Sequence, residues 1–186
     1  MRLSDEVLDV IVIGGGASGM FAALAAAKRG KKVLILEKNR QLGEKLAITG
    51  GGRCNITNAE PDKHAFLKHY GKDAKFLYSP YAQFGVEDTF KYFESRGMPL
   101  VVQAKKRAFP ETENAEDVVK LLGDELKKLK VFVKLACTVK KIVKEGSTVT
   151  AVETNQGMFR AKSFILATGG ASHPETGSTG DGFKWL

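Results

Sequence analysis

Three glycines, at positions 14, 16 and 19, have the spacing G-x-G-x-x-G that binds a dinucleotide pyrophosphate when it joins a strand to a helix. They follow the apolar run LDVIVI and precede ASGMFAALAAAKRG, which predicts that context. The first glycine permits a tight turn, the second lets backbone approach the phosphates, and the third lets helix and strand pack closely. Ser18 adds a hydroxyl, and the helix N-terminus adds N–H donors and the positive end of its dipole.

A carboxylate follows these glycines at the distance expected of a ribose ligand. Glu37 closes the second predicted strand, KKVLILEKN, about 20 residues beyond Gly16. A carboxylate there accepts two hydrogen bonds from an adenosine ribose and repels a 2′-phosphate. The glycines and Glu37 together predict an adenine dinucleotide that lacks a 2′-phosphate. The alternative is an ordinary turn beside a surface acid.

A second glycine run, ITGGGRCNITN at residues 48–58, favours FAD over NAD. An NAD-binding unit usually continues through a crossover helix to a third strand, whereas residues 43–58 have the composition of a polar, glycine-bearing loop. FAD continues through a ribityl chain to a flat ring, which such a loop would line. Arg53 offers a fixed cation and five donors to phosphate or to the negative charge of a reduced flavin.

Cys54 has two interpretations. Beside Arg53 its thiol could have a lowered pKa and act as a redox or nucleophilic group. A cysteine with no CxxC partner is more often a small packing residue, and we favour packing. None of the three histidines, His64, His69 and His173, has a pairing in the sequence that identifies a catalytic base.

The elements that must position these residues indicate an α/β fold with a Rossmann-like sheet. We expect short helices at 63–70, 74–84 and 86–97, and a longer helix at 114–130 capped by Asn114. Strands are predicted at 99–103, 130–145, 147–155 and 158–170, with a turn at 145–147. Residues 107–113 are predicted as a loop leading into the long helix.

Composition bounds the class of protein. The 186 residues are 43% hydrophobic, enough for one globular domain with an appended lobe. The net charge is +8, but Lys and Arg are spread among acidic residues, so we expect no nucleic-acid partner. Two cysteines without metal-ligand spacing predict neither a metal site nor a disulfide and fit the cytoplasm. The N-terminus predicts neither a signal peptide nor a membrane span.

Three blocks together resemble the FAD-dependent oxidoreductases of the BaiN and aminoacetone oxidase type: DVIVIGGGASGMFAALAAAKRGKKVLILEKN, GEKLAITGGGRCNITN and ILATGGASHPETGSTGDG. The resemblance runs from about Asp9 to the last residue, and its second and third blocks are the more specific. It implies a glutathione-reductase-like FAD domain with substrate-side segments, including 107–119, inserted between its halves. We expect one incomplete FAD-binding domain over 1–186: a βαβ unit and glycine loop (1–58), a mostly helical excursion (59–130) and a β-rich segment with a second cofactor loop (131–186).

The same resemblance assigns residues to the parts of FAD. It implies pyrophosphate contacts from Gly14, Gly16, Ala17, Ser18 and Gly19, ribose contacts from Glu37 and Lys38, and ribityl and ring contacts from Lys45, Gly51, Gly52, Arg53, Cys54 and Asn55. Adenine would meet the backbone of Thr138 and Val139, while Ala167, Thr168, Gly169 and Gly170 would close over the cofactor with Thr179 and Asp181 nearby. Asp181 would bond a ribityl hydroxyl, cap the helix starting there, or do both.

Two departures from the family pattern stand out. A further flavin-contacting glycine segment near the family's C-terminus has no counterpart here, and Glu44 replaces a common basic residue. The end of the chain, GSTGDGFKWL, stops at the first turn of a predicted helix with an exposed Trp-Leu, so we expect a fragment of a longer protein.

The function predicted is flavin-mediated hydride or electron transfer on a small-molecule substrate, with NAD(P)H as a candidate electron donor. The ring would carry the chemistry, and the protein would supply orientation and charge. No residue pattern identifies a substrate, a catalytic residue or an oligomeric state. Three alternatives stay open: an NAD-only dehydrogenase, a non-catalytic dinucleotide-binding fragment and, as the weakest, an RNA-binding flavoprotein.

Overall fold

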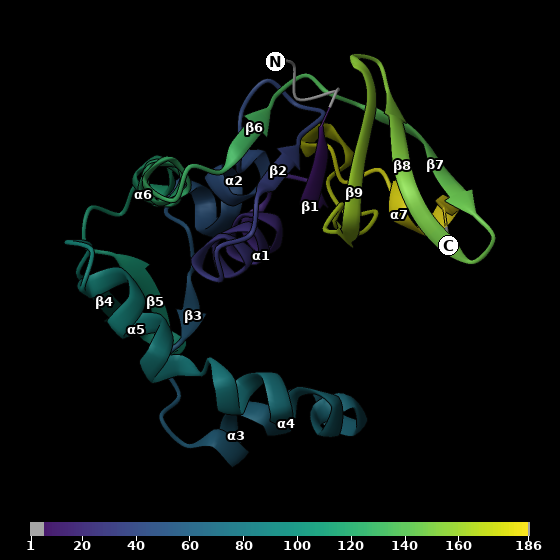
Figure 1. Ribbon diagram of the computed structural model, residues 1–186. Helices are drawn as coiled ribbons and strands as arrows, with labels where there is room; N and C mark the ends of the chain where they lie inside the picture. The colour runs from purple at the N-terminus through teal and green to yellow at the C-terminus, as the bar shows by residue number, and fades with distance from the viewer. Residues whose placement is uncertain (1–5, 186) are drawn as a thin grey trace. The chain divides into compact units, whose positions relative to one another are not determined.

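The computed structural model describes residues 6–185 and divides into two compact units (Figure 1). The first unit contains the chain up to Leu46 and from Val119 onward, and the second contains Ala47–Val118. The second unit overlaps the predicted helical excursion at 59–130. Each unit is described separately below.

The first unit is built on a six-stranded sheet with the order β6-β2-β1-β9-β8-β7. β1 (Val7–Ile13), β2 (Val33–Leu36), β6 (Phe132–Lys134) and β9 (Gly157–Leu166) are parallel, and β8 (Thr148–Thr154) and β7 (Val139–Glu145) continue as antiparallel strands. β1 and β2 are nearly all apolar because a central parallel strand is covered on both faces. Figure 1 shows β7, β8 and β9 as the long strands on the right of the sheet.

The register of the parallel strands decides where the first unit can hold a ligand. Ile13 pairs with both Leu36 and Leu166, so the carboxyl ends of β1, β2 and β9 lie level. The residues that follow these strands therefore meet at one edge of the sheet. In open α/β sheets that edge is where ligands bind.

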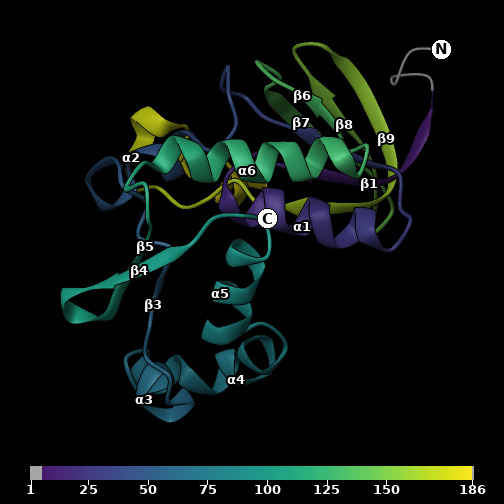
Figure 2. The same cartoon turned by 90° about the vertical axis from the view of Figure 1, so that its left-hand side faces the viewer.

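Helices flank this sheet. α1 (Ala17–Lys28) contacts β1, β2 and β9 and ends, as expected, before Gly30 in the left-handed region, at φ 72° (Figure 2). α6 (Ala115–Lys128) spans the boundary between the units, and the predicted cap is confirmed because Asn114 Oδ1 accepts a hydrogen bond from the N–H of Glu116 at 3.0 Å. The prediction of an exposed Trp185 is wrong: α7 (Asp181–Trp185) places this residue, half-buried, against the sheet's core. Leu186 lies outside the described residues.

The second unit contains a small antiparallel sheet and short helices. Its sheet has the order β3 (Thr57–Asn58), β5 (Arg107–Pro110), β4 (Leu100–Gln103). The predicted short helices are confirmed as α3 (Lys63–Lys68), α4 (Ala74–Gln83) and α5 (Val86–Glu94), with a 3₁₀ turn at Gly71–Asp73 before α4.

Two predictions of loops are wrong. Residues 43–58 contain α2 (Glu44–Gly52), a short helix whose regular turn stops at Thr49, where ψ is 149°. Residues 107–110 form β5, because fully buried Ala108 and Phe109 pack inside the unit while the backbone pairs with β4. Both segments are too short for a hydrophobic period to be recognised in the sequence.

Candidate functional site

The geometry of the turn between β1 and α1 explains why two of its residues must be glycine. Gly14 has φ 108°, and a Cβ added to it would lie 2.4 Å from the carbonyl oxygen of Ala167, after β9. A Cβ at Gly19 would lie 1.9 Å from the carbonyl oxygen of Gly14. The structural roles predicted for these glycines, a tight turn and close packing of helix on strand, are therefore confirmed.

Gly16 differs from its neighbours. Its φ of −76° is open to any residue, and an added Cβ would meet no atom within 4 Å. Gly16 is the N-cap of α1, so no side chain caps the helix, and Ala17 and Ser18 in its first turn are exposed. The uncapped N–H groups and the helix dipole make this end of α1 suitable for an anion. A pyrophosphate lying against bare backbone here fits the residues present.

Glu37 holds the turn together. The residue is only 7% exposed. Its Oε2 accepts a hydrogen bond from the N–H of Gly15 at 2.6 Å, and its Oε1 accepts one from the N–H of Asn39 at 2.7 Å. A carboxylate oxygen has two lone pairs, so both oxygens keep capacity for ribose hydroxyls. The sequence did not lead us to predict a contact of Glu37 with Gly15 or Asn39. The run of three glycines could have indicated Gly15, but no feature of the sequence indicates Asn39.

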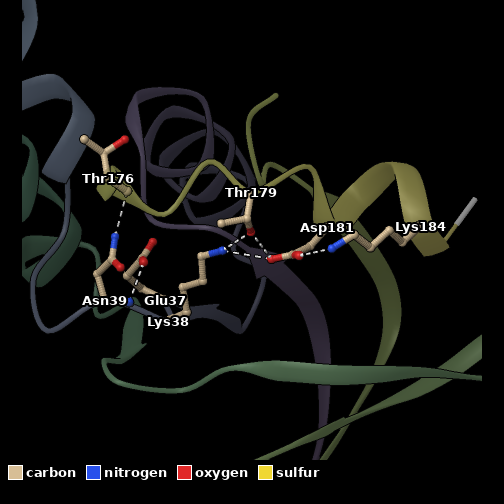
Figure 3. A network of polar contacts seen from close by, with 7 residues as sticks. All are labelled: Glu37, Lys38, Asn39, Thr176, Thr179, Asp181 and Lys184. Carbon is tan, nitrogen blue, oxygen red and sulfur yellow. Dashed lines mark hydrogen bonds and ion pairs between the residues drawn. The ribbon is translucent and has the colours of Figure 1, made fainter. Parts of the chain in front are cut away.

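Lys38, for which the resemblance implies a ribose contact, bonds two residues near the end of the chain. Figure 3 shows its Nζ donating to Thr179 Oγ1 at 2.6 Å and to Asp181 Oδ2 at 2.8 Å. The Thr179 hydroxyl also donates to Asp181 Oδ2, at 2.7 Å. These bonds, led by the one from Lys38, hold the pKa of the Asp181 carboxyl below its ordinary value. Lys38 thus ties the end of β2 to the start of α7, where Asp181 is the first helical residue.

The segment after β9 lies over the same edge of the sheet. The N–H of Ala167 donates to the carbonyl of Ile13 at 2.8 Å, and Gly169 follows in the left-handed region, at φ 71°. Lys45 holds the segment from the other side, since its Nζ donates to the carbonyl of Ser172 at 2.6 Å. Asn39 Nδ2 adds a bond to the carbonyl of Thr176 at 2.9 Å (Figure 3).

Thr138 and Val139 are the residues expected to contact the adenine through their backbone groups. The N–H of Thr138 donates to Asn155 Oδ1 at 2.8 Å, and its carbonyl accepts from the N–H of Asn155 at 3.1 Å. Val139 is the first residue of the edge strand β7 and pairs with Thr154, next to a shift in the register between β7 and β8.

The second glycine loop belongs to the second unit and is held by Arg53. Arg53 Nη1 donates to Gln103 Oε1 at 3.1 Å and lies 3.6 Å from Glu113 Oε1, and its guanidinium carbon is 4.4 Å from the centre of the Phe109 ring. Arg53 Nε donates to the carbonyl of Gly50 at 3.2 Å. These contacts anchor the loop to β4 and β5.

The glycines of this loop are required by backbone conformation. Gly50, Gly51 and Gly52 all have positive φ, at 60°, 69° and 84°. Added Cβ atoms at Gly51 and Gly52 would meet nothing within 4 Å, whereas one at Gly50 would lie 2.9 Å from the N of Asn55. The loop therefore presents bare backbone at Gly51 and Gly52.

Cys54 is buried, 2% exposed, and burial raises the pKa of its thiol. The alternative of a thiol activated by Arg53 is wrong, because loss of hydration disfavours the thiolate more than nearby groups favour it. The packing interpretation agrees with this environment. Both cysteines in the described residues are free.

The predicted site residues are thus divided between the units: Gly51, Gly52, Arg53, Cys54 and Asn55 lie in the second and the others in the first. Within residues 6–185 no group of His, Cys, Asp and Glu side chains could hold a metal ion. None of the helices described is long and apolar enough to cross a membrane.

Comparisons with known proteins identify the family to which this chain belongs. Residues 8–186 match the family described as HI0933-like protein Rossmann domain. The chain is 35% identical over 176 residues to the 3-dehydro-bile acid delta(4,6)-reductase of Clostridium scindens, covering 92% of this chain and 41% of that protein. It is 30% identical over 179 residues to the ribosomal RNA dihydrouridine synthase of Escherichia coli, covering 96% and 44%. The chain therefore spans less than half the length of these relatives.

Solved structures share the fold. The open conformation of a flavocytochrome c3 fumarate reductase matches with a TM-score of 0.71 at 24% identity, over 89% of this chain and 34% of that one. The 3-ketosteroid-delta4-(5alpha)-dehydrogenase of Rhodococcus jostii RHA1 matches with a TM-score of 0.66 at 20% identity, over 89% and 46%. The predicted α/β Rossmann-like fold and the family resemblance are both confirmed. The chain belongs to the HI0933-like Rossmann-domain family, a family of FAD-binding oxidoreductases.

Proposed function

We propose that this chain holds the adenosine diphosphate half of FAD at the β1–α1 turn and supports flavin-dependent hydride transfer to an activated carbon–carbon double bond. The observation that carries the proposal is the open space at Gly16. No contact within the chain excludes a side chain there, yet the residue lies at the uncapped end of α1, next to the turn that Glu37 holds.

The residues around Gly16 have separate roles in this proposal. The first N–H groups of α1, including those of Ala17 and Ser18, bind the pyrophosphate. Glu37 accepts the ribose hydroxyls with its remaining lone pairs, and Val139 offers its N–H and C=O to the adenine. Lys38 acts indirectly, by fixing Thr179 and Asp181.

The second glycine loop would serve the rest of the cofactor. Gly51 and Gly52 present backbone without side chains, which suits a close approach to a flat ring. Arg53 is fixed by Gln103 and by the Phe109 ring, so its remaining N–H donors are oriented without further loss of conformational freedom. We propose Cys54 and Asn55 as the flanks of this loop's cofactor surface, and Lys45, in the first unit, as a further cofactor contact.

The type of reaction is suggested by the names of the relatives. One is a delta(4,6)-reductase of a bile acid and another a synthase of dihydrouridine, and both names describe the addition of hydrogen to an unsaturated ring. When bound and reduced by its electron donor, the flavin would supply the hydride for such a reduction, and a proton would complete the addition. The protein's part is to hold the ring, exclude water and keep charge in place. A small conjugated ring compound is the proposed substrate, with NAD(P)H as the proposed electron donor.

A second candidate substrate is an RNA base, reduced by the same chemistry. The relatives named ribosomal RNA dihydrouridine synthase, from Escherichia coli and Haemophilus influenzae, are 30% and 29% identical over 96% and 94% of this chain. The net charge of +8 is compatible with a polyanionic substrate.

The test of the flavin proposal is the visible absorption spectrum of the purified chain after incubation with FAD and desalting. The expected result is retained flavin bands, with a large loss for Glu37→Gln because an amide replaces one acceptor oxygen by a donor. Glu153→Gln, an exposed change on β8, is the matched control and should retain flavin fully.

A wild-type chain that retains no flavin but binds NAD would favour an NAD-only dehydrogenase. Retained flavin that neither NADH nor NADPH reduces, and that passes no hydride to conjugated ring compounds, would favour a non-catalytic dinucleotide-binding fragment. Equal flavin retention in the Glu37→Gln chain would remove the proposed ribose contact.

A further inference from the structure

One segment of the second unit differs in composition from the rest of the chain. Residues 63–84, which contain α3, the 3₁₀ turn and α4, include four lysines, two histidines and six aromatic residues, but one acid, Asp73. The net charge of the whole sequence does not reveal this local excess of lysine over acidic residues. The preceding acid, Asp62, is used as a helix cap, since its Oδ1 accepts a hydrogen bond from the N–H of Ala65 at 2.6 Å.

The lysines of this segment are available to a ligand. Lys68, Lys72 and Lys75 are exposed and form no ion pair with any residue in the described part of the chain. Elsewhere exposed lysines do pair: Lys127 with Asp124, Lys128 with Glu125 and Lys162 with Asp9. Within residues 6–185 the charges of these three lysines are thus not neutralised by an ion pair.

Aromatic rings are exposed among these lysines. Phe76, in the first turn of α4, is 84% exposed, and Tyr78 is 36% exposed. Exposing a phenylalanine ring to water forgoes most of the free energy that its burial would supply. The exposed Phe76 ring is therefore available to contact a flat or apolar partner.

Several of these rings and cations are neighbours. Lys72, Lys75 and Phe76 are three and four residues apart, which makes them neighbours on the outside of the helical segment. Tyr78 is three residues from Lys75, and Lys63 Nζ lies 5.0 Å from the centre of the Tyr78 ring. The Tyr78 hydroxyl lies 3.4 Å from His64 Nδ1, and Figure 2 shows α3 beside α4. We call Lys63, His64, Lys72, Lys75, Phe76 and Tyr78 the basic aromatic face.

We propose that the basic aromatic face binds single-stranded RNA, with Phe76 stacking on a base and Lys72 and Lys75 contacting the backbone phosphates. The inference rests on the second substrate class proposed above and adds to it a surface on which that substrate docks. Sequence-independent single-strand binding combines cations that follow the phosphates with rings that stack on successive bases. An interfacial membrane helix instead needs a continuous apolar side, whereas here the rings are set singly among cations.

The test is fluorescence anisotropy of a labelled oligouridine RNA of about 12 nucleotides, titrated with the full chain at several salt concentrations. Lys72→Glu/Lys75→Glu should weaken binding at least about tenfold and lower the slope of log K against log salt by roughly 1.4, because two phosphate contacts are lost. Lys140→Glu/Lys144→Glu, which makes the same change of charge on exposed positions of β7, should change affinity far less.

Phe76 tests the stacking component. Phe76→Ala should weaken RNA binding about tenfold with little change in the salt slope, and Phe76→Trp should restore it. Circular dichroism spectra confirm that each variant is folded. RNA binding is measured with and without FAD, so loss of the flavin site does not remove the readout.

Three results would overturn the proposal. The first is RNA affinity unchanged by both the Lys72→Glu/Lys75→Glu and Phe76→Ala changes. The second is equal weakening by the β7 control. The third is preference of the chain for anionic phospholipid vesicles, or for the DNA of the same sequence, over the RNA.

Discussion

The two glycine-rich loops have similar composition but need their glycines for different reasons. In the β1–α1 turn, a side chain at Gly14 or Gly19 would collide with backbone oxygens of the same unit. In the second loop, Gly51 and Gly52 have open space around them but adopt left-handed backbone conformations that strain other residues. Packing alone constrains Gly19, and backbone dihedral angles alone constrain Gly51 and Gly52, whereas both constraints act on Gly14 and Gly50.

Some of these glycines are needed because a side chain would collide with neighbouring atoms, whereas others leave the backbone open to a ligand. Gly16 in the first loop and Gly51 and Gly52 in the second have no neighbour within 4 Å of an added Cβ. Bare backbone is useful where a large planar or anionic group must come close. Gly16 is therefore where the cofactor hypothesis can be tested apart from folding, whereas a test at Gly51 or Gly52 needs a control for backbone strain.

Gly19→Ala should have the largest effect on stability. Its Cβ would overlap the carbonyl oxygen of Gly14, a backbone atom, so α1 must move away from β1 at a cost of about 3 kcal/mol or more. Urea unfolding followed by circular dichroism measures the change.

The matched control is Gly123→Ala, another glycine inside a helix. A Cβ on Gly123 would meet nothing within 4 Å, so alanine should stabilise α6 by about 0.5–1 kcal/mol. If the two substitutions had the same effect, the packing explanation for the first loop would be wrong.

Gly51→Val should have the next largest effect. A β-branched residue at φ 69° costs about 2 kcal/mol. We also predict that the variant loses flavin, because the valine side chain would fill the space proposed for the cofactor. Thermal unfolding and the absorption spectrum after desalting measure the two effects separately.

Gly71→Val is the control for strain alone. Gly71 has φ 56° and open space around its Cβ position, but it lies in the 3₁₀ turn before α4. It should lose similar stability and keep its flavin. Normal flavin content in the Gly51→Val chain would sink the proposed role of the second loop.

The sequence predicted the first loop better than the second for a physical reason. The strand, turn and helix around Gly14 are consecutive in the chain, so hydrophobic pattern and glycine spacing suffice to place them. The second loop depends on residues far along the chain: Arg53 is held by Gln103 and Glu113, and β5 supplies Phe109. No local pattern encodes those contacts.

The same distinction applies to Glu37 and Lys38, which are adjacent in sequence. Glu37 occupies its expected position at the end of β2 because strand register brings it to Gly15. Lys38, implied at the ribose, bonds Thr179 and Asp181, more than 100 residues away. The Lys38 contact is a tertiary one, and the sequence offers no spacing rule for it.

Gly16→Ala should have the smallest effect on stability and is the sharpest test of the comparison. The φ of −76° suits alanine, which reduces the freedom of the unfolded chain, while an N-cap prefers glycine to alanine. These terms oppose each other, so the free energy of unfolding should change by less than about 0.5 kcal/mol. FAD affinity should nevertheless fall at least about tenfold, because the added methyl group occupies the space proposed for the pyrophosphate. Titration of FAD by flavin fluorescence measures that loss, with Gly123→Ala as the control. A chain with unchanged stability and unchanged FAD affinity would show that the bare surface at Gly16 serves no ligand, and the first loop would then be explained by packing alone.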